Sequence, residues 1–164
     1  VDCGTKYKGY FGDSAYTFGV GQVSQAAEHL MQTTRESLYK GIEKAVAGNR
    51  IGDIGAAVQN YVEARGFSVV REMVGHGIGS NLHESPDVPN YGRPGQGKHL
   101  EEGMVICIEP MINQGGCGVY LERNGWTLRT ADNKNSAHYE LTVVIRKQQA
   151  EILSTFAFIE GKTI

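Results

Sequence analysis

This sequence of 164 residues lacks several features that would define its class at once. Its formal net charge is only -2, so no excess of one sign points to nucleic acid or an anionic membrane as a partner. No apolar run approaches the length of a membrane span, and no signal peptide opens the chain. These absences leave a globular protein of ordinary composition, long enough to bury a core as one domain.

Cysteine is scarce as well. The three cysteines, Cys3, Cys107 and Cys117, are odd in number and form no CxxC pair. This argues against a disulfide framework or a zinc ribbon and favours a reducing compartment. Glycine, in contrast, occurs 22 times, about twice its usual share, which predicts many tight turns and close backbone approaches.

The order of predicted elements is a hairpin, two helices and then a β-rich meander, which is an α+β arrangement. Residues 1–20 are predicted to form the hairpin, with a turn at 7–9. Further strands are predicted at 67–70, 104–112, 118–122, 125–130, 137–146 and 150–155.

Apolar residues at helical spacing predict two amphipathic helices. The first covers 24–47, with Gly48 as its stop. The second covers 53–65, with Asp53 as N-cap and Gly66 as its stop.

The stretch VGHGIGSNLHESPDVPNYG, residues 74–92, carries two of the five histidines, His76 and His83. Its glycines and prolines make a helix unfavourable, so it is predicted to be a glycine-rich loop. Imidazoles on such a loop could ligate a cation, act on a substrate or simply pack.

Four of the 18 acidic residues do not fit a solvated face. Asp2 and Asp13 lie on the two arms of the predicted hairpin, so strand pairing brings both carboxylates to one end of it. Glu109 interrupts the apolar strand MVICIEPMI, and Glu140 interrupts HYELTVVI. A buried acid is costly unless it is paired or ligates a cation. Edge exposure or a structural ion pair would explain any one of them, but four beside His76 favour a cation site.

Four carboxylates and one imidazole favour Mn(II), Fe(II), Co(II) or Zn(II) over a soft-metal site. Because they exceed the needs of one ion, they predict two ions about 3.5–4 Å apart, an arrangement that activates water for hydrolysis. Cys107 can face the same side of a strand as Glu109, although a core role is the simpler interpretation. His83 can then donate a hydrogen bond to a substrate carbonyl, or it can be satisfied by the backbone of its loop.

Four segments together resemble, in order and spacing, the C-terminal part of type I methionine aminopeptidases: VDCGTKYKGYFGDSAYTF, VGHGIGSNLHESPDVPNYG, GMVICIEPMI and NSAHYELTVV. The resemblance implies a pita-bread (creatinase/aminopeptidase) fold lacking most of its N-terminal half. Residues 1–164 would then form one truncated catalytic domain, which is not expected to be a fully competent methionine aminopeptidase alone. It also implies removal of the initiator methionine from nascent polypeptides in the cytoplasm by a monomer. The ribosome is a candidate partner, whereas nucleic acid and membranes are not expected.

By that resemblance two divalent ions are held by Asp2, Asp13, His76, Glu109 and Glu140, with Asp13 and Glu140 expected to bridge them. His83 is the expected catalytic hydrogen-bond donor to the substrate carbonyl, and Glu109 is the expected general base. Trp126 and Leu82 are expected beside the methionine side chain, although the family usually has Phe where this chain has Leu82.

Two other functions stay open. An Xaa-Pro aminopeptidase or prolidase shares the five ligands, but GHGIGSNLHESP together with IEPMI fits the methionine enzyme better. A non-catalytic pita-bread binding module would keep the fold and lose the ligands, whereas all five are present here. The metal content of the purified protein would separate a metallopeptidase from such a binding module.

Overall fold

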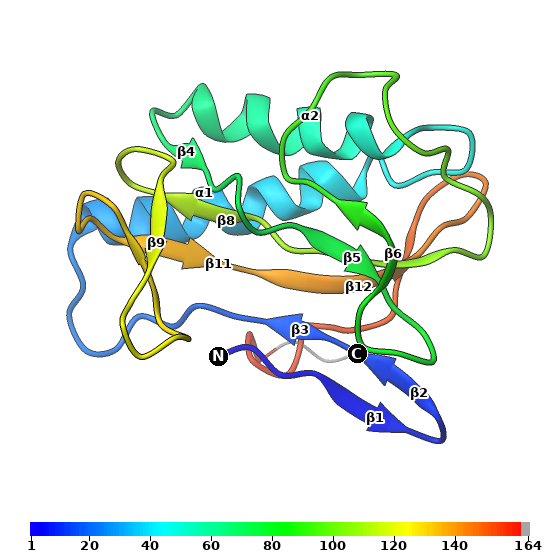
Figure 1. Cartoon of the computed structure of the whole chain (residues 1–164), viewed down its shortest axis with the longest axis horizontal. Coiled ribbons are helices and arrows are strands. Elements are labelled where there is room, and N and C mark those ends of the chain that lie inside the picture. Colours follow the sequence, from blue (N-terminus) through cyan, green and yellow to red (C-terminus); the bar gives the residue numbers. More distant parts are fainter. Residues whose placement is uncertain (162–164) are drawn as a thin grey trace.

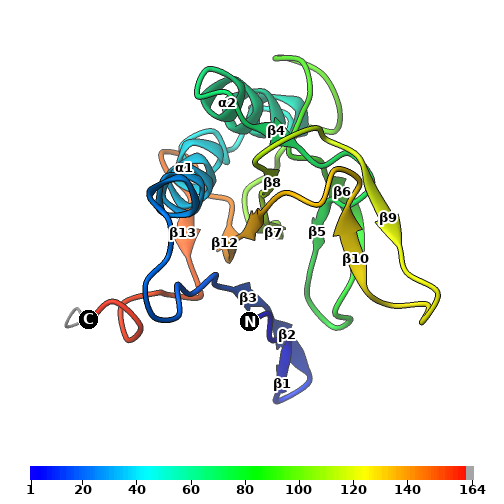
Figure 2. The same ribbon diagram turned by 90° about the vertical axis from the view of Figure 1, so that its left-hand side faces the viewer.

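Two helices lie side by side on one side of a set of short strands, with the first hairpin on the other side (Figures 1 and 2). The computed structural model describes residues 1–161. The helices are α1 (Gln25–Ile42) and α2 (Ile51–Glu63). The strands are β1 (Thr5–Tyr7), β2 (Tyr10–Gly12), β3 (Ser14–Ala15), β4 (Ser68–Val69), β5 (Gly75–Gly77), β6 (Glu84–Val88), β7 (Val105–Ile108), β8 (Met111–Asn113), β9 (Val119–Leu121), β10 (Leu128–Thr130), β11 (Ser136–His138), β12 (Glu140–Val144) and β13 (Glu151–Ile152). Neither helix in this part of the chain combines the length and hydropathy needed to span a bilayer.

The central sheet has the strand order β13-β12-β7-β5-β6, with β3 also paired to β12. A second sheet has the order β11-β8-β4, while β1-β2 and β9-β10 are separate hairpins. The strands pair antiparallel, as expected for an α+β protein. The predicted meander is wrong, because β7 joins β12 to β5 and so brings distant parts of the chain together.

Alternation along the central strands separates a core face from a polar face. In β7, Ile106 and Ile108 belong to the hydrophobic core, so Cys107 between them points to the opposite side. In β12, the core residues Leu141 and Val143 likewise alternate with Glu140 and Thr142. The helices complete the core with Leu30, Leu38, Ile54, Val58 and Val62. The polar face is therefore the one turned away from the helices.

The first hairpin is confirmed, although it is shorter than predicted. β1 pairs with β2 around a turn at Lys8 and Gly9, whose φ angles are 48° and 93°. The chain then continues into β3, where Ala15 pairs with Glu140 and also forms an isolated bridge with Asp2. The hairpin is thus attached to the central sheet at the level of its acidic residues.

The first helix ends at Ile42, five residues before the predicted end at 47. Beyond it, the Ala45 N–H bonds to the Ile42 carbonyl in a tighter turn. The Ala47 N–H then donates to the Arg146 carbonyl, so the segment leaves the helix to contact the sheet. A tertiary hydrogen bond therefore overrides local helical spacing.

The second helix begins two residues before the predicted start, and Asp53 is not its N-cap. The N-cap is Arg50, and the Asp53 carboxylate, at position N3, accepts a hydrogen bond from the Arg50 N–H at 2.7 Å. This is the reciprocal half of a capping box. The helix ends at Glu63 rather than at 65, and Gly66 follows with a φ of 79°.

Two predicted long strands are each broken at the same level. MVICIEPMI divides into β7 and β8 at Glu109–Pro110, and 137–146 divides into β11 and β12 at Tyr139. Pro110 has no N–H for a ladder, but its carbonyl accepts a hydrogen bond from Tyr139. Glu109 and Glu140 therefore sit where both segments pass from one sheet to the other. The other predicted strands are present in shorter form as β4, β9, β10 and β13.

The segment predicted to be a glycine-rich loop contains β5 and β6, so the loop prediction is wrong for His76, which lies in β5. Its glycines serve close strand packing. A Cβ on Gly75 would lie 2.3 Å from the Cys107 carbonyl oxygen, and one on Gly77 would lie 2.4 Å from that of Ser85. Without side chains at these positions, β5 can approach both neighbours and fix His76 between them.

We expect Gly75→Ala to destabilise the protein by about 1–3 kcal/mol, because its methyl group would overlap a backbone oxygen that cannot move freely. Thermal unfolding measures this loss. Gly116→Ala is the matched control, since a Cβ there meets nothing within 4 Å and should leave the melting temperature nearly unchanged. Equal effects of the two substitutions would contradict the packing role.

Candidate metal centre

The five predicted ligand residues come from distant elements and meet on the polar face. Asp2 precedes β1, Asp13 lies between β2 and β3, and His76 lies in β5. Glu109 directly follows β7, and Glu140 begins β12. One cavity is lined by all five together with His83 and by Met73, Val74, Gly75 and Asp87.

His76 is the centre of this group. Its Nε2 atom lies 3.9 Å from Asp13 Oδ2, 3.6 Å from Glu109 Oε1 and 4.0 Å from Glu140 Oε1. These separations are too long for hydrogen bonds. Two bonds of about 2.0–2.2 Å to a shared divalent cation would span them. The spacing therefore fits a metal site better than a set of direct ion pairs.

The His76 ring is oriented for ligation. Its Nδ1 lies 2.9 Å from the carbonyl oxygen of Gly77, which can only accept a hydrogen bond. The proton of the neutral ring is therefore on Nδ1, and the lone pair of Nε2 faces the carboxylates. A backbone acceptor of this kind fixes the tautomer of metal-binding histidines.

The carboxylates carry more negative charge than the described residues neutralise. Asp13, Glu109 and Glu140 are 7%, 9% and 2% exposed, and the ion pairs they form within residues 1–161 are with histidines. Burial, and next the neighbouring Glu109, raise the pKa of Glu140 to about 9. Burial and Asp2 likewise raise the pKa of Asp13. Within residues 1–161 the buried Glu140 Oε1 has no hydrogen-bond partner. These acids thus fit a cation that would bind between them.

Backbone contacts hold the acids in place. The Thr142 hydroxyl accepts a hydrogen bond from the Asp13 N–H at 3.0 Å and donates to the Asp13 carbonyl at 2.8 Å. The Ser14 hydroxyl donates to the Glu140 carbonyl. The buried Asn90 side chain donates to the Glu109 carbonyl at 3.0 Å. The acidic residues are therefore fixed by the sheet rather than by flexible loops.

His83 lies at the mouth of the cavity, in the connection between β5 and β6. Its ring stands edge-on to that of His76, with 4.3 Å between centroids and 82° between planes. The adjacent Glu84 carboxylate accepts hydrogen bonds from the Asn81 N–H and the Ser80 hydroxyl, which also lower its pKa. This closed turn presents the exposed His83 imidazole to whatever enters the cavity.

The two predicted pocket residues differ in position. Leu82 packs on the first hairpin, where a Cβ on Gly4 would lie 2.8 Å from its Cδ1. Trp126 is 83% exposed in the turn between β9 and β10, where its N–H bonds to Asn124. Trp126 does not line the cavity that holds the acids. The structure therefore brings Leu82, but not Trp126, towards the five ligand residues.

His138 is a neighbour of the site that sequence reasoning missed. Its buried Nε2 lies 3.4 Å from Glu109 Oε2 and makes no hydrogen bond in the described part of the chain. Thr17 holds the His138 backbone through its hydroxyl, which accepts from the N–H and donates to the carbonyl. The signal in the sequence was the two-residue spacing between His138 and Glu140. In an extended chain, side chains two residues apart point to the same face.

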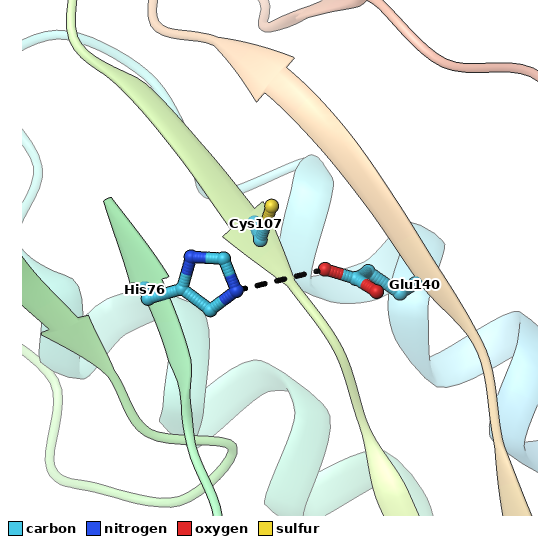
Figure 3. Close-up of side chains that lie close together, drawn as sticks. All are labelled: His76, Cys107 and Glu140. Carbon is cyan, nitrogen blue, oxygen red and sulfur yellow. Dashed lines mark ion pairs between the residues drawn. The ribbon is translucent and has the colours of Figure 1, made fainter. Parts of the chain in front are cut away.

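Two overlapping groups of three residues have ligand atoms within 4.8 Å of one another: His76, Cys107 and Glu140, and Asp2, Asp13 and Glu140. Glu109 belongs to neither group and approaches the site through His76. Figure 3 shows the first group, with the side chains converging from β5, β7 and β12. Glu140 belongs to both groups, which is the position that a bridging carboxylate requires. Asp2 differs from the others in being exposed.

Comparison with known proteins agrees with this geometry. Metallopeptidase family M24 matches residues 1–147. A methionine aminopeptidase of Clostridium perfringens is 55% identical over 154 residues, which are 94% of this chain and 62% of that protein. The crystal structure of a methionine aminopeptidase from Thermotoga maritima superposes with a TM-score of 0.91 at 44% identity, covering 93% of this chain and 61% of that one. The chain thus spans about six tenths of the length of the relatives it matches.

A prolidase from Pyrococcus horikoshii shares the fold at greater distance. Its TM-score is 0.73 at 25% identity, covering 94% of this chain and 39% of that one. Similarity to methionine aminopeptidases is therefore much higher than to this proline-specific relative, and the pita-bread fold is confirmed. The chain belongs to metallopeptidase family M24, whose members use divalent metal ions.

Proposed function

We propose that this chain carries the metal centre of a methionine aminopeptidase, which removes the N-terminal methionine of nascent polypeptides. The observation that carries the proposal is the convergence of three buried carboxylates on His76 Nε2. The high identity to methionine aminopeptidases supports methionine as the residue removed.

We assign two divalent ions, of cobalt, manganese, iron or zinc, to Asp2, Asp13, His76, Glu109 and Glu140. The presence of Glu140 in both ligand groups supports two positions that share one carboxylate. Ions at such positions activate a water molecule and polarise the carbonyl of a scissile bond.

The protein side chains supply the proton transfers and the orientation. Glu109, with one oxygen facing His76 and the other facing His138, is placed to accept a proton from the attacking water. His83, at the mouth of the cavity, is placed to donate a hydrogen bond to the carbonyl oxygen as its charge develops. The proton taken up by Glu109 is then available to the departing amino group.

The proposal extends to the setting of the reaction. Because new polypeptides are the substrates, the protein would act in the cytoplasm near the ribosome, as a monomer. Co-sedimentation of the chain with ribosomes, with and without a nascent peptide, tests this partnership separately from catalysis.

Cleavage of short peptides tests the proposed specificity. We expect the metal-loaded chain to release methionine from Met-Ala-Ser and to leave Ala-Pro-Ser intact. Cleavage of the proline peptide alone would support an Xaa-Pro aminopeptidase or prolidase activity. Full metal loading without cleavage of either peptide would support a binding module.

Metal titration tests the number of ions. We expect two divalent ions per chain, and we expect Asp2→Ala to lower this to one, because Asp2 occurs in only one of the two ligand groups. Glu28→Ala on the exposed side of α1 is the control. Uptake of at most one ion by the unmodified chain, unchanged by Asp2→Ala, would contradict the two-ion assignment.

Substitution of His83 tests its role apart from metal binding. We expect His83→Ala to keep its metal and lower kcat about a hundredfold, the usual cost of one donor to a developing oxyanion. His99→Ala, at an exposed position, should have no effect. Equal loss of metal in His83→Ala and in a ligand variant would show that His83 is itself a ligand.

A further inference from the structure

We propose that Cys107 adds a thiolate ligand at the floor of the metal centre, so that His76, Cys107 and Glu140 bind a thiophilic divalent cation such as zinc or cadmium. This position shares His76 and Glu140 with the proposed peptidase centre. Its occupation does not depend on peptidase activity, so the two proposals are tested by different measurements.

The geometry brings one nitrogen, one sulfur and one oxygen ligand together. The three side chains come from adjacent strands of the central sheet, in the order β12-β7-β5. Their ligand atoms lie within 4.8 Å of one another, and all three residues are buried (Figure 3). Zinc binds such atoms at about 2.0–2.3 Å, so one cation can reach all three after small side-chain adjustments.

The glutamate in this group needs a partner. Glu140 is 2% exposed, and its buried Oε1 has no hydrogen-bond partner among the residues that the structure describes. The same atom faces His76 Nε2 at 4.0 Å (Figure 3). An unpaired carboxylate oxygen in the interior is costly, and a cation between these two atoms removes that cost.

The sulfur of Cys107 has lone pairs free for a cation. The Thr142 hydroxyl lies 3.5 Å from this sulfur, and the Glu140 carboxylate is a second hydrogen-bonding neighbour of the thiol. That hydroxyl donates its proton to the Asp13 carbonyl, so it has none to give to sulfur. No hydrogen bond from Thr142 therefore competes with ligation of the sulfur.

Binding would release a proton. The thiolate is the form of cysteine that ligates a metal, whereas the free side chain carries a proton on sulfur. A bound divalent ion replaces this proton, forming one metal–sulfur bond while the proton passes to water.

Sulfur changes the metal preference of the centre. Carboxylates suit manganese, whereas thiolate ligands favour zinc and similar soft cations. We therefore expect Cys107→Ser to weaken zinc binding by at least about tenfold, the lower end of the losses seen when a metal site is disturbed. Manganese binding should be unchanged, because the carboxylates and His76 are retained.

Cobalt spectroscopy gives the decisive readout. Cys3 and Cys117 are exposed, and Cys3 lies beside the ligand Asp2, so both are first replaced by serine. In this Cys3→Ser/Cys117→Ser chain, Cys107 is the remaining thiol. We expect added Co(II) to produce a sulfur-to-cobalt charge-transfer band in the near ultraviolet, and we expect Cys107→Ser or Cys107→Ala in the same background to abolish it.

The band in the double variant decides the question without any change at Cys107, so a folding defect of a Cys107 variant does not affect the test. Cobalt uptake without the band overturns the thiolate site but leaves the peptidase proposal intact. Failure of the double variant to take up any cobalt also overturns the proposed thiolate site. Cleavage of Met-Ala-Ser is scored separately and carries no weight for the thiolate ligand.

Discussion

Replacement of His76 by alanine should abolish both metal retention and peptide cleavage. Three carboxylates point at His76 Nε2 from 3.6 to 4.0 Å, and the ring provides the nitrogen ligand of the five predicted residues. Loss of a residue that hydrogen-bonds to a metal ligand lowers metal affinity about 10–100-fold, so loss of the ligand itself should lower it more. Calorimetric titration with Mn(II) or Co(II), followed by a cleavage assay at saturating metal, measures both effects.

His29→Ala is the matched control for this substitution. His29 is exposed on α1, where its ring contacts Phe67. It is not among the residues that line the cavity of the five ligand residues. It should bind metal and cleave peptide as the unmodified chain does. Normal metal affinity in His76→Ala would remove His76 from the ligand set and, with it, the centre of the proposed site.

Glu109→Gln should lower kcat by about 10² to 10⁴-fold, the usual contribution of a positioned general base. The amide keeps the size of the carboxylate and an oxygen that can face a cation, so part of the metal binding should survive. It cannot accept a proton from water at neutral pH. The loss should therefore appear in kcat at saturating metal rather than only in metal affinity.

Glu101→Gln makes the same chemical change at an exposed position and should leave turnover unchanged. Turnover of Glu109→Gln close to that of the unmodified chain at saturating metal would exclude Glu109 as the base. His83 would then be the next candidate, because it lines the same cavity.

The candidate site was the most predictable part of this protein. A carboxylate inside an apolar strand is costly, so Glu109 and Glu140 could be singled out from the sequence alone. The structure places both beside His76, and their role as ligands stays a prediction. The two segments were expected to be uninterrupted strands, yet they break at Glu109–Pro110 and at Tyr139 and cross between sheets.

Features that depend on tertiary contacts could not be predicted. The end of α1 is set by a hydrogen bond to Arg146, about a hundred residues away in sequence. Local spacing predicts helix through 47 because it contains no information about this partner. The glycines around His76 were read as loop residues for the same reason, since the Cys107 carbonyl that requires Gly75 belongs to another strand.

His138 was missed by sequence reasoning, whereas Trp126 was assigned by it. His138 contacts Glu109, but its part in the site is visible only once β11 and β12 are placed. Trp126 was assigned by resemblance, and it lies exposed on a hairpin turn away from the cavity. Resemblance to a family identifies which residue types to expect. The position of a residue on an exposed hairpin, such as Trp126, also depends on what packs against that hairpin.

Anomalous diffraction from crystals of the manganese-loaded chain tests the central claim most directly. The account predicts two anomalous peaks within the cavity, each in bonding distance of carboxylate oxygens, with Glu140 touching both and His76 Nε2 touching one. Ions bound elsewhere on the protein, or a manganese-loaded crystal whose five side chains hold no peak, would contradict it.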